Sequence, residues 1–222
     1  MNKREFINNV IEIYVDARNV RFSEHKISQS KVRRGRSHTI SSTVEDLLAC
    51  YLVDAFPMID KIMLDQAITF QIGLKKKTIH PDLSIVVNNE IKCFIDLKMD
   101  LGRKREAILS IHEKAKSHLR AVCGKSVTYK DGITKEDFVI KVSEKASYPI
   151  AVISRKNINI NALCSQLDEL CGQNGYKNSK YYFFTDGVHP NIQSSQKAYR
   201  EITLLPDFDE FINDIALHIK SN

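Results

Sequence analysis

Two aspartates and a lysine lie at the ends of two apolar segments, in the run from His80 to Lys98. Side chains of a strand alternate between its faces with a period of two, so Asp96 and Lys98 leave the same face, roughly 7 Å apart. If Asp82 joins them, the cluster could hold a divalent metal ion beside a fixed ammonium group. Hydrolysis of a phosphodiester requires that combination.

Whether Asp82 reaches this cluster depends on how the two apolar segments pair. Asn88 and Asn89 are a plausible two-residue hairpin turn, because asparagine tolerates positive φ, and this turn would place Asp82 opposite Ile95. The hydrophobic pattern instead places Asp82 opposite Asp96. The buried face would then carry Leu83, Ile85, Val87, Ile91, Cys93, Ile95 and Leu97. Because a one-residue slip would turn this face over, we expect burial to decide the register, through a longer loop or a β-bulge.

The composition indicates a single domain spanning residues 1–222, of which 43% are hydrophobic. No segment approaches the roughly 20 apolar residues of a membrane span, and charges near the N-terminus argue against a signal peptide, so we expect a soluble cytoplasmic protein. The five cysteines include no Cys-x-x-Cys pair, which favours core thiols over a zinc site. The net charge of +6 suits a polyanionic partner.

Helices and a basic arm are predicted before the two apolar segments. Apolar spacing predicts a helix over residues 3–17, followed by an exposed basic arm to residue 40. A second helix begins near Ser42 and carries Glu45. Gln66 to Leu74 is predicted to form a strand of an antiparallel meander with the two strands of the motif, and Lys75, Lys76 and Lys77 its first turn.

The core, residues 41–185, continues after the motif with a helix over 103–122 and a hairpin insertion near 125–142 that carries an Asp-Gly turn signal. Residues 148–154 and 180–185 are continuous apolar runs, typical of buried strands, and residues 160–171 between them predict a helix. This order implies a parallel crossover, so the sheet should be mixed. Residues 186–222 should form a loop and a C-terminal helix.

The pattern resembles the PD-(D/E)xK nuclease superfamily, and in particular type II restriction endonucleases. The matching residues are Pro81-Asp82, then 13 intervening residues, then Asp96-Leu97-Lys98, with Glu45 on a preceding helix. The resemblance covers roughly residues 40–185. It implies a three-layer α/β/α sandwich around a central mixed sheet, in which an antiparallel meander is continued by parallel strands.

The resemblance also implies roles for these residues. Asp82, Asp96 and the backbone carbonyl of Leu97 would bind Mg²⁺, for which Mn²⁺ could substitute, and Lys98 would orient the attacking water. Glu45 would bind a second metal ion or its water. Each residue also has a structural alternative. Ser42-x-x-Glu45 fits a capping box, Asp82 could be a turn residue, and Lys98 could simply extend from a strand end into solvent.

Basic and polar side chains outside the motif are candidate DNA contacts. Those of the arm are Lys31, Arg33, Arg34 and Arg36, for which a solvated arm is the alternative. Those of the two loops are Lys130, His189, Asn191 and Gln193. The motif and its resemblance thus predict a Mg²⁺-dependent, sequence-specific endonuclease that cuts double-stranded DNA and leaves 5′-phosphates.

Cutting both strands of a palindromic site calls for two active sites, so a homodimer is expected, with the N-terminal and C-terminal helices as candidate dimer surfaces or as pure core. Two rival functions remain open. One is a structure-selective repair or recombination nuclease of the same superfamily. The other is a non-catalytic DNA-binding protein on the same scaffold.

Overall fold

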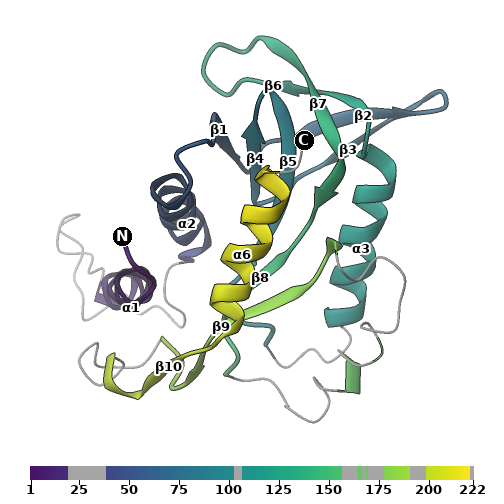
Figure 1. Cartoon of the computed structure of the whole chain (residues 1–222). Helices are drawn as coiled ribbons and strands as arrows, with labels where there is room; N and C mark the ends of the chain where they lie inside the picture. Colours follow the sequence, from purple (N-terminus) through teal and green to yellow (C-terminus); the bar gives the residue numbers. More distant parts are fainter. Residues whose placement is uncertain are drawn as a thin grey trace, which may run out of the picture.

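The computed structural model describes residues 1–19, 39–102, 107–156, 165–166, 169, 178–190 and 199–220. Its strands form a mixed sheet with helices on both faces, so the predicted α/β class and three layers are confirmed (Figure 1). Helices α1 (Lys3–Asn19), α2 (Ser41–Ala55) and α6 (Asp207–Lys220) pack on one face, and α3 (Ala107–Val122) packs on the other. The strands are β1 (Lys61–Leu64), β2 (Ile68–Ile72), β3 (Lys75–Ile79), β4 (Leu83–Val87), β5 (Glu90–Lys98), β6 (Ser126–Lys130), β7 (Asp137–Ser147), β8 (Ile150–Ser154), β9 (Tyr181–Gly187) and β10 (Ile202–Leu204).

Strand β5 lies at the centre of the sheet, where the sheet divides. One edge of β5 pairs antiparallel with β4, which in turn pairs with β1. The other edge pairs in parallel with two strands in succession, β7 along residues 90–93 and β8 along residues 96–98. Strand β7 leads on to β6, β2 and β3, and β8 leads on to β9 and β10. Asp96 and Lys98, the two motif residues of β5, lie beyond the last β4 pair and are paired with Ile150 and Val152 of β8.

The β4–β5 hairpin contains both the predicted turn and the predicted bulge. Asn88 and Asn89 have φ of 53° and 56°, as a type I′ turn requires, and Val87 pairs with Glu90. Further from the turn the register shifts by one residue, so that Leu83 pairs with Ile95. One step beyond this pair, Asp82 is brought opposite Asp96, and the register prediction is confirmed.

The extra residue of this bulge is Lys92, because Ile85 pairs with Cys93 and Val86 pairs with Ile91. The bulge overturns one part of the predicted face. Ile91 packs with Val86 on the α3 side of the sheet, whereas Cys93 and the residues after it keep the predicted alternation.

The predicted meander is wrong in its third strand. Strand β1, which we did not predict, occupies the edge of β4, and β2 pairs instead with β3 and β6. Lys75, Lys76 and Lys77 are not a turn but the first residues of β3, and the turn of the β2–β3 hairpin falls at Gly73, whose φ is +58°. The four residues of β1 are too few for a periodic signal, which is why the pattern missed them.

The predicted insertion near 125–142 is a hairpin, but not an excursion from the sheet. Strands β6 and β7 pair antiparallel, and β7 enters the sheet beside β5. The connection is a six-residue loop, 131–136, rather than a two-residue Asp-Gly turn. Asp131 closes this loop by accepting hydrogen bonds from the backbone N–H groups of Ile133 and Thr134.

The second half of the core follows the prediction. Strands β8 and β9 run parallel, and the first five residues of each are buried. The helix predicted over 160–171 falls largely outside the described residues. The start of the helix predicted over 103–122 also lies outside them, and the described part of that helix is α3. Gly124, with φ of +73°, follows the end of α3. A short antiparallel strand, β10, was not predicted.

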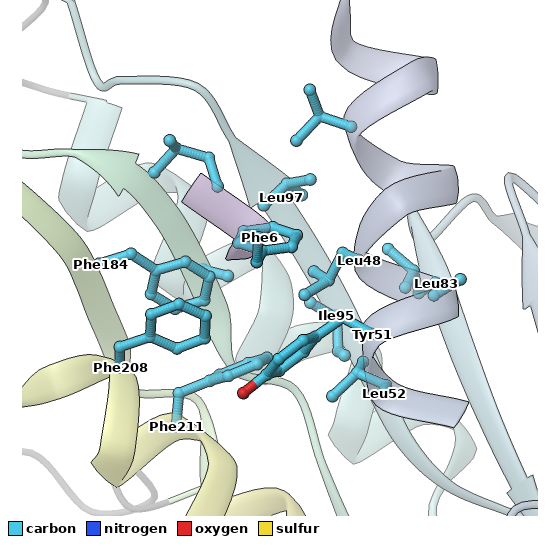
Figure 2. Packing of buried hydrophobic residues seen from close by; sticks show 14 of the residues in the cluster. Phe6, Leu48, Tyr51, Leu52, Leu83, Ile95, Leu97, Phe184, Phe208 and Phe211 are labelled. Atoms are coloured by element: carbon cyan, nitrogen blue, oxygen red, sulfur yellow. The ribbon is translucent and has the colours of Figure 1, made fainter. Parts of the chain in front are cut away.

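The two terminal helices use their apolar faces in the core rather than in an exposed surface. Phe6 and Val10 of α1 are fully buried, as are Phe208 and Phe211 of α6. Figure 2 shows Phe6, Phe208 and Phe211 converging on Phe184 of β9. These residues therefore do not form a dimer surface, and the alternative that they are core holds. Among the described residues, no helix is long and apolar enough to cross a membrane.

Candidate active site

The motif side chains meet at the end of β5. Lys98 Nζ lies 3.3 Å from Asp82 Oδ2 and 3.4 Å from Asp96 Oδ2, so the ammonium group bridges the two carboxylates. Asp82 Oδ2 also accepts a hydrogen bond of 2.6 Å from the backbone N–H of Leu97. The site is open on one side, because the side chains of Asp82 and Lys98 keep 24% and 31% of their exposure while Asp96 keeps 11%. Residues from two segments are thus joined by one bulged hairpin.

The protonation of this cluster follows from its surroundings. Burial raises the pKa of Asp82 above its usual range, and Asp96 adds to the effect, although Lys98 and the Leu97 N–H oppose it. Burial alone would lower the pKa of Lys98, but the two carboxylates outweigh it and the net pKa is raised. Lys98 therefore remains a cation at neutral pH, as charge stabilisation requires.

Tyr148 is a site residue that the sequence did not single out. Its hydroxyl donates a 3.1 Å hydrogen bond to Asp96 Oδ1, which leaves Oδ2 as the oxygen directed at Lys98. The Tyr148 ring is buried against Phe94 and against His118 of α3, with centroid distances of 5.6 Å and 5.9 Å. Because Tyr148 precedes Pro149 in an apolar run, the pattern predicted only a buried strand residue at this position.

Glu45 reaches the same cluster from α2, and its capping alternative is wrong. The N-cap of α2 is Ile40, no side chain caps the helix, and Ser42 lies within the first turn. Burial, Asp82 and Asp65 together raise the pKa of Glu45 to about 7, against a smaller opposing effect of Lys98. Asp65, which sequence reasoning missed, follows β1 with φ of 43° and donates its backbone N–H to the carbonyl of Asp82.

The raised pKa of Glu45 makes the stability of the metal-free protein depend on pH. Because the folded-state pKa lies above the unfolded value, this group stabilises the fold below pH 4.5, and the contribution is lost as pH rises towards about 7. Between pH 4 and pH 8 the free energy of unfolding should therefore fall less in Glu45→Gln than in wild-type protein. We expect the difference to be about 1 kcal/mol or less, since solvent screens a half-exposed group. Urea unfolding in EDTA across this pH range measures the difference, and an identical pH dependence in both proteins would contradict the prediction.

The donor set fits a hard divalent cation. Among the described residues, no group of three His, Cys, Asp or Glu side chains is arranged to hold a metal ion. Mg²⁺, however, is commonly held by only one or two carboxylates and keeps several waters. Asp82 and Asp96 supply two carboxylates in a partly buried position, and a divalent cation would relieve the cost that burial places on the charge of Asp82. Glu45 adds a third carboxylate at longer range.

The predicted DNA contacts are only partly described. The basic arm, with Lys31, Arg33, Arg34 and Arg36, lies outside the described residues, as do Asn191 and Gln193. Lys130 is exposed at the end of β6, and its carbonyl accepts a hydrogen bond from Gln66, next to Asp65. His189 lies 3.0 Å from Asp100, two residues beyond Lys98, and its ring packs against Tyr14. The loop of His189 therefore contacts the segment that follows Lys98.

Comparisons with known proteins leave the interpretation to this geometry. No protein-family model matches the chain, and neither the curated proteins nor the solved structures contain a match.

Proposed function

We propose that the chain is a Mg²⁺-dependent endonuclease of the PD-(D/E)xK type, with Asp82, Asp96 and Lys98 as its catalytic residues. One observation carries the proposal. A bulge at Lys92 aligns Asp82 with Asp96 although the Asn88-Asn89 turn alone would separate them, and both carboxylates then contact Lys98. Two carboxylates and an ammonium group in a largely apolar sheet cost folding free energy. Clusters of this kind are found often at functional sites, which supports a catalytic role.

The residues divide the reaction between them. Asp82 and Asp96 would hold a Mg²⁺ ion, which, when bound, would polarise the phosphoryl group and activate a water molecule. Lys98 orients the attacking water and offsets the negative charge that develops on the phosphoryl oxygens. The water oxygen bonds to phosphorus as the bond to the 3′-oxygen breaks, and the products are a 5′-phosphate and a 3′-hydroxyl. Glu45, whose carboxyl group interacts electrostatically with Asp82 and Lys98, would accept the water proton or hold a second ion.

The substrate we propose is double-stranded DNA cut at a specific sequence by a homodimer, as in a restriction enzyme. A net charge of +6 supports a polyanionic substrate. One chain carries one copy of the site, and cutting both strands of a symmetric sequence needs two.

Digestion of a supercoiled plasmid with Mg²⁺, followed by sequencing of the fragment ends, tests the proposal. Discrete fragments with 5′-phosphates and a common end sequence would support it. Cleavage confined to branched or single-stranded substrates would favour a structure-selective nuclease. Intact DNA together with measurable binding would favour a non-catalytic DNA-binding protein.

Tyr148→Phe should weaken metal binding without unfolding the protein. The change removes the hydrogen bond to Asp96 Oδ1 and keeps the buried ring, so Asp96 loses its fixed orientation. We expect about a 10- to 100-fold rise in the Mg²⁺ concentration for half-maximal cleavage, as for other partners of metal ligands. Mn²⁺ binding followed by electron paramagnetic resonance gives an independent readout.

Tyr129→Phe is the matched control, because that hydroxyl contacts Lys61 outside the site. Equal metal affinities in wild-type protein and Tyr148→Phe would show that the Tyr148 hydroxyl has no role in orienting Asp96.

A further inference from the structure

The β2–β3 hairpin projects from the sheet as a narrow ribbon (Figure 1). Strand β6 pairs with β2 only at Ile68 and Thr69, whereas β2 and β3 stay paired out to Ile72 and Lys75. The outer part of the hairpin is therefore a two-stranded ribbon, and at its tip Leu74 is 99% exposed. A two-stranded ribbon is marginally stable alone in water, so a partner that covers it would stabilise it.

This ribbon carries an unneutralised positive charge. Lys75, Lys76 and Lys77 are all exposed, and no acidic residue occurs between Gln66 and His80. Within the described part of the chain, none of these three lysines forms an ion pair, whereas Lys98, Lys116 and Lys141 each contact a carboxylate. These three lysines give the ribbon a charge of +3, whereas the net charge of the whole chain is +6.

The lysines occupy both faces of the ribbon. Lys77 pairs with Phe70 and Lys75 with Ile72, so these two lysines share one face, and Lys76, paired with Gln71, lies on the other. The major groove of B-DNA is about 12 Å wide and admits a two-stranded β-ribbon. Because lysine side chains are long and flexible, the ammonium groups on both faces of a ribbon inserted there could extend to the phosphates that line the groove.

The ribbon also leads directly to the candidate active site. Strand β3 ends at Ile79, and only His80 and Pro81 separate it from Asp82. At no more than about 3.6 Å per residue, Lys77 lies at most roughly 18 Å from Asp82, and Lys75 at most roughly 25 Å. With a rise of about 3.4 Å per base pair, these lysines lie within roughly five to seven base pairs of a phosphate at the site.

We propose that the β2–β3 hairpin is an arm that enters the major groove of duplex DNA beside the site and holds the backbone through Lys75, Lys76 and Lys77. This inference rests on the proposed nuclease function, because it takes DNA as the substrate. The arm positions the duplex and contributes no catalytic group.

A charge-matched pair of variants tests the arm. The first is Lys75→Gln/Lys76→Gln/Lys77→Gln. The second removes three exposed charges on helices, Lys114→Gln/Arg120→Gln/Lys220→Gln, so both lower the net charge by the same amount. Binding to a mixed-sequence 30-base-pair duplex is followed by fluorescence anisotropy with Ca²⁺ in place of Mg²⁺, at several salt concentrations.

The arm variant should lower the slope of log affinity against log salt by about 2 to 3, since each lost phosphate contact contributes about 0.9. The helix variant should change the slope by less than about 0.5. Equal changes in the two variants, or no change in the arm variant, would overturn the proposal. Lys75→Arg/Lys76→Arg/Lys77→Arg keeps the charge and should bind like wild-type protein.

Lysines on an edge strand also prevent edge-to-edge association, so the triple glutamine variant could aggregate. The single variants Lys75→Gln and Lys77→Gln then decide the question, with an expected slope loss of about 0.9 each and none if the lysines act only against aggregation. Cleavage is measured separately. A wild-type protein that binds duplex with the expected slopes but leaves it intact overturns the nuclease function and not the arm.

Discussion

Lys98→Met should lower the rate of DNA cleavage by about 10³-fold while leaving Ca²⁺ binding no weaker than in wild-type protein. The substitution keeps an unbranched side chain that is one atom shorter, but it removes the ammonium group that lies 3.3 Å and 3.4 Å from the two carboxylates. Loss of one group that stabilises developing charge typically costs about 10² to 10³ in rate. Binding of a divalent ion should not suffer, because the variant no longer places a positive charge between Asp82 and Asp96.

Asp96→Asn should behave differently, and the contrast makes the test specific. The amide is isosteric and still accepts the hydrogen bond from Tyr148, but it lacks the charge that holds a metal ion. We therefore expect loss of both cleavage and Ca²⁺ binding. Calorimetric titration with Ca²⁺ and single-turnover cleavage of plasmid DNA in Mg²⁺ separate the two effects.

Lys116→Met is the matched control for Lys98→Met. Lys116 lies on α3, its side chain is 12% exposed, and it pairs with Glu113 at 3.2 Å. It should keep wild-type cleavage. If Lys98→Met and Asp96→Asn changed only the free energy of unfolding and left plasmid cleavage intact, the cluster would be a structural ion-pair network instead of a catalytic site.

The sequence was most informative where two local rules disagreed. The Asn88-Asn89 turn and the burial pattern demand registers that differ by one residue, and a bulge satisfies both. That a bulge was needed could be inferred, but its position at Lys92 could not, because Ile91 and Lys92 both lie in a strand that reads as regular. The face of Ile91 was therefore predicted wrongly.

Local patterns could not predict the edge strand of the sheet or the residue that orients Asp96. Strand β1 has four residues, and its place beside β4 is set by long-range pairing, which periodicity does not report. Tyr148 reaches Asp96 because β8 pairs with β5 at Asp96, and that alignment joins residues more than fifty positions apart. The sequence motif indicates the candidate reacting groups, whereas the residues that hydrogen-bond to them depend on the fold.

Phe208→Ala should destabilise the fold by about 3 to 5 kcal/mol, which is a large fraction of the roughly 5 to 15 kcal/mol of a typical domain. The Phe208 ring is fully buried and stacks on Phe184 with a centroid distance of 4.0 Å, and it also contacts Phe6 and Tyr51 (Figure 2). Its removal leaves a cavity between α1, α2, α6 and β9 that rigid aromatic neighbours cannot close. Urea unfolding followed by circular dichroism measures the loss.

Leu217→Ala, on the same helix but 70% exposed, is the control and should change stability by no more than about 0.5 kcal/mol. Phe208 packs against the face of β5 that carries Ile95 and Leu97, whereas Asp96 leaves the opposite face and is held by Tyr148 and Lys98. Well below its melting temperature, Phe208→Ala should therefore keep Ca²⁺ affinity within about threefold of wild type. A large loss of affinity in folded protein would show that the helical layer around Phe208 positions the carboxylates, and that the bulged hairpin alone is not sufficient.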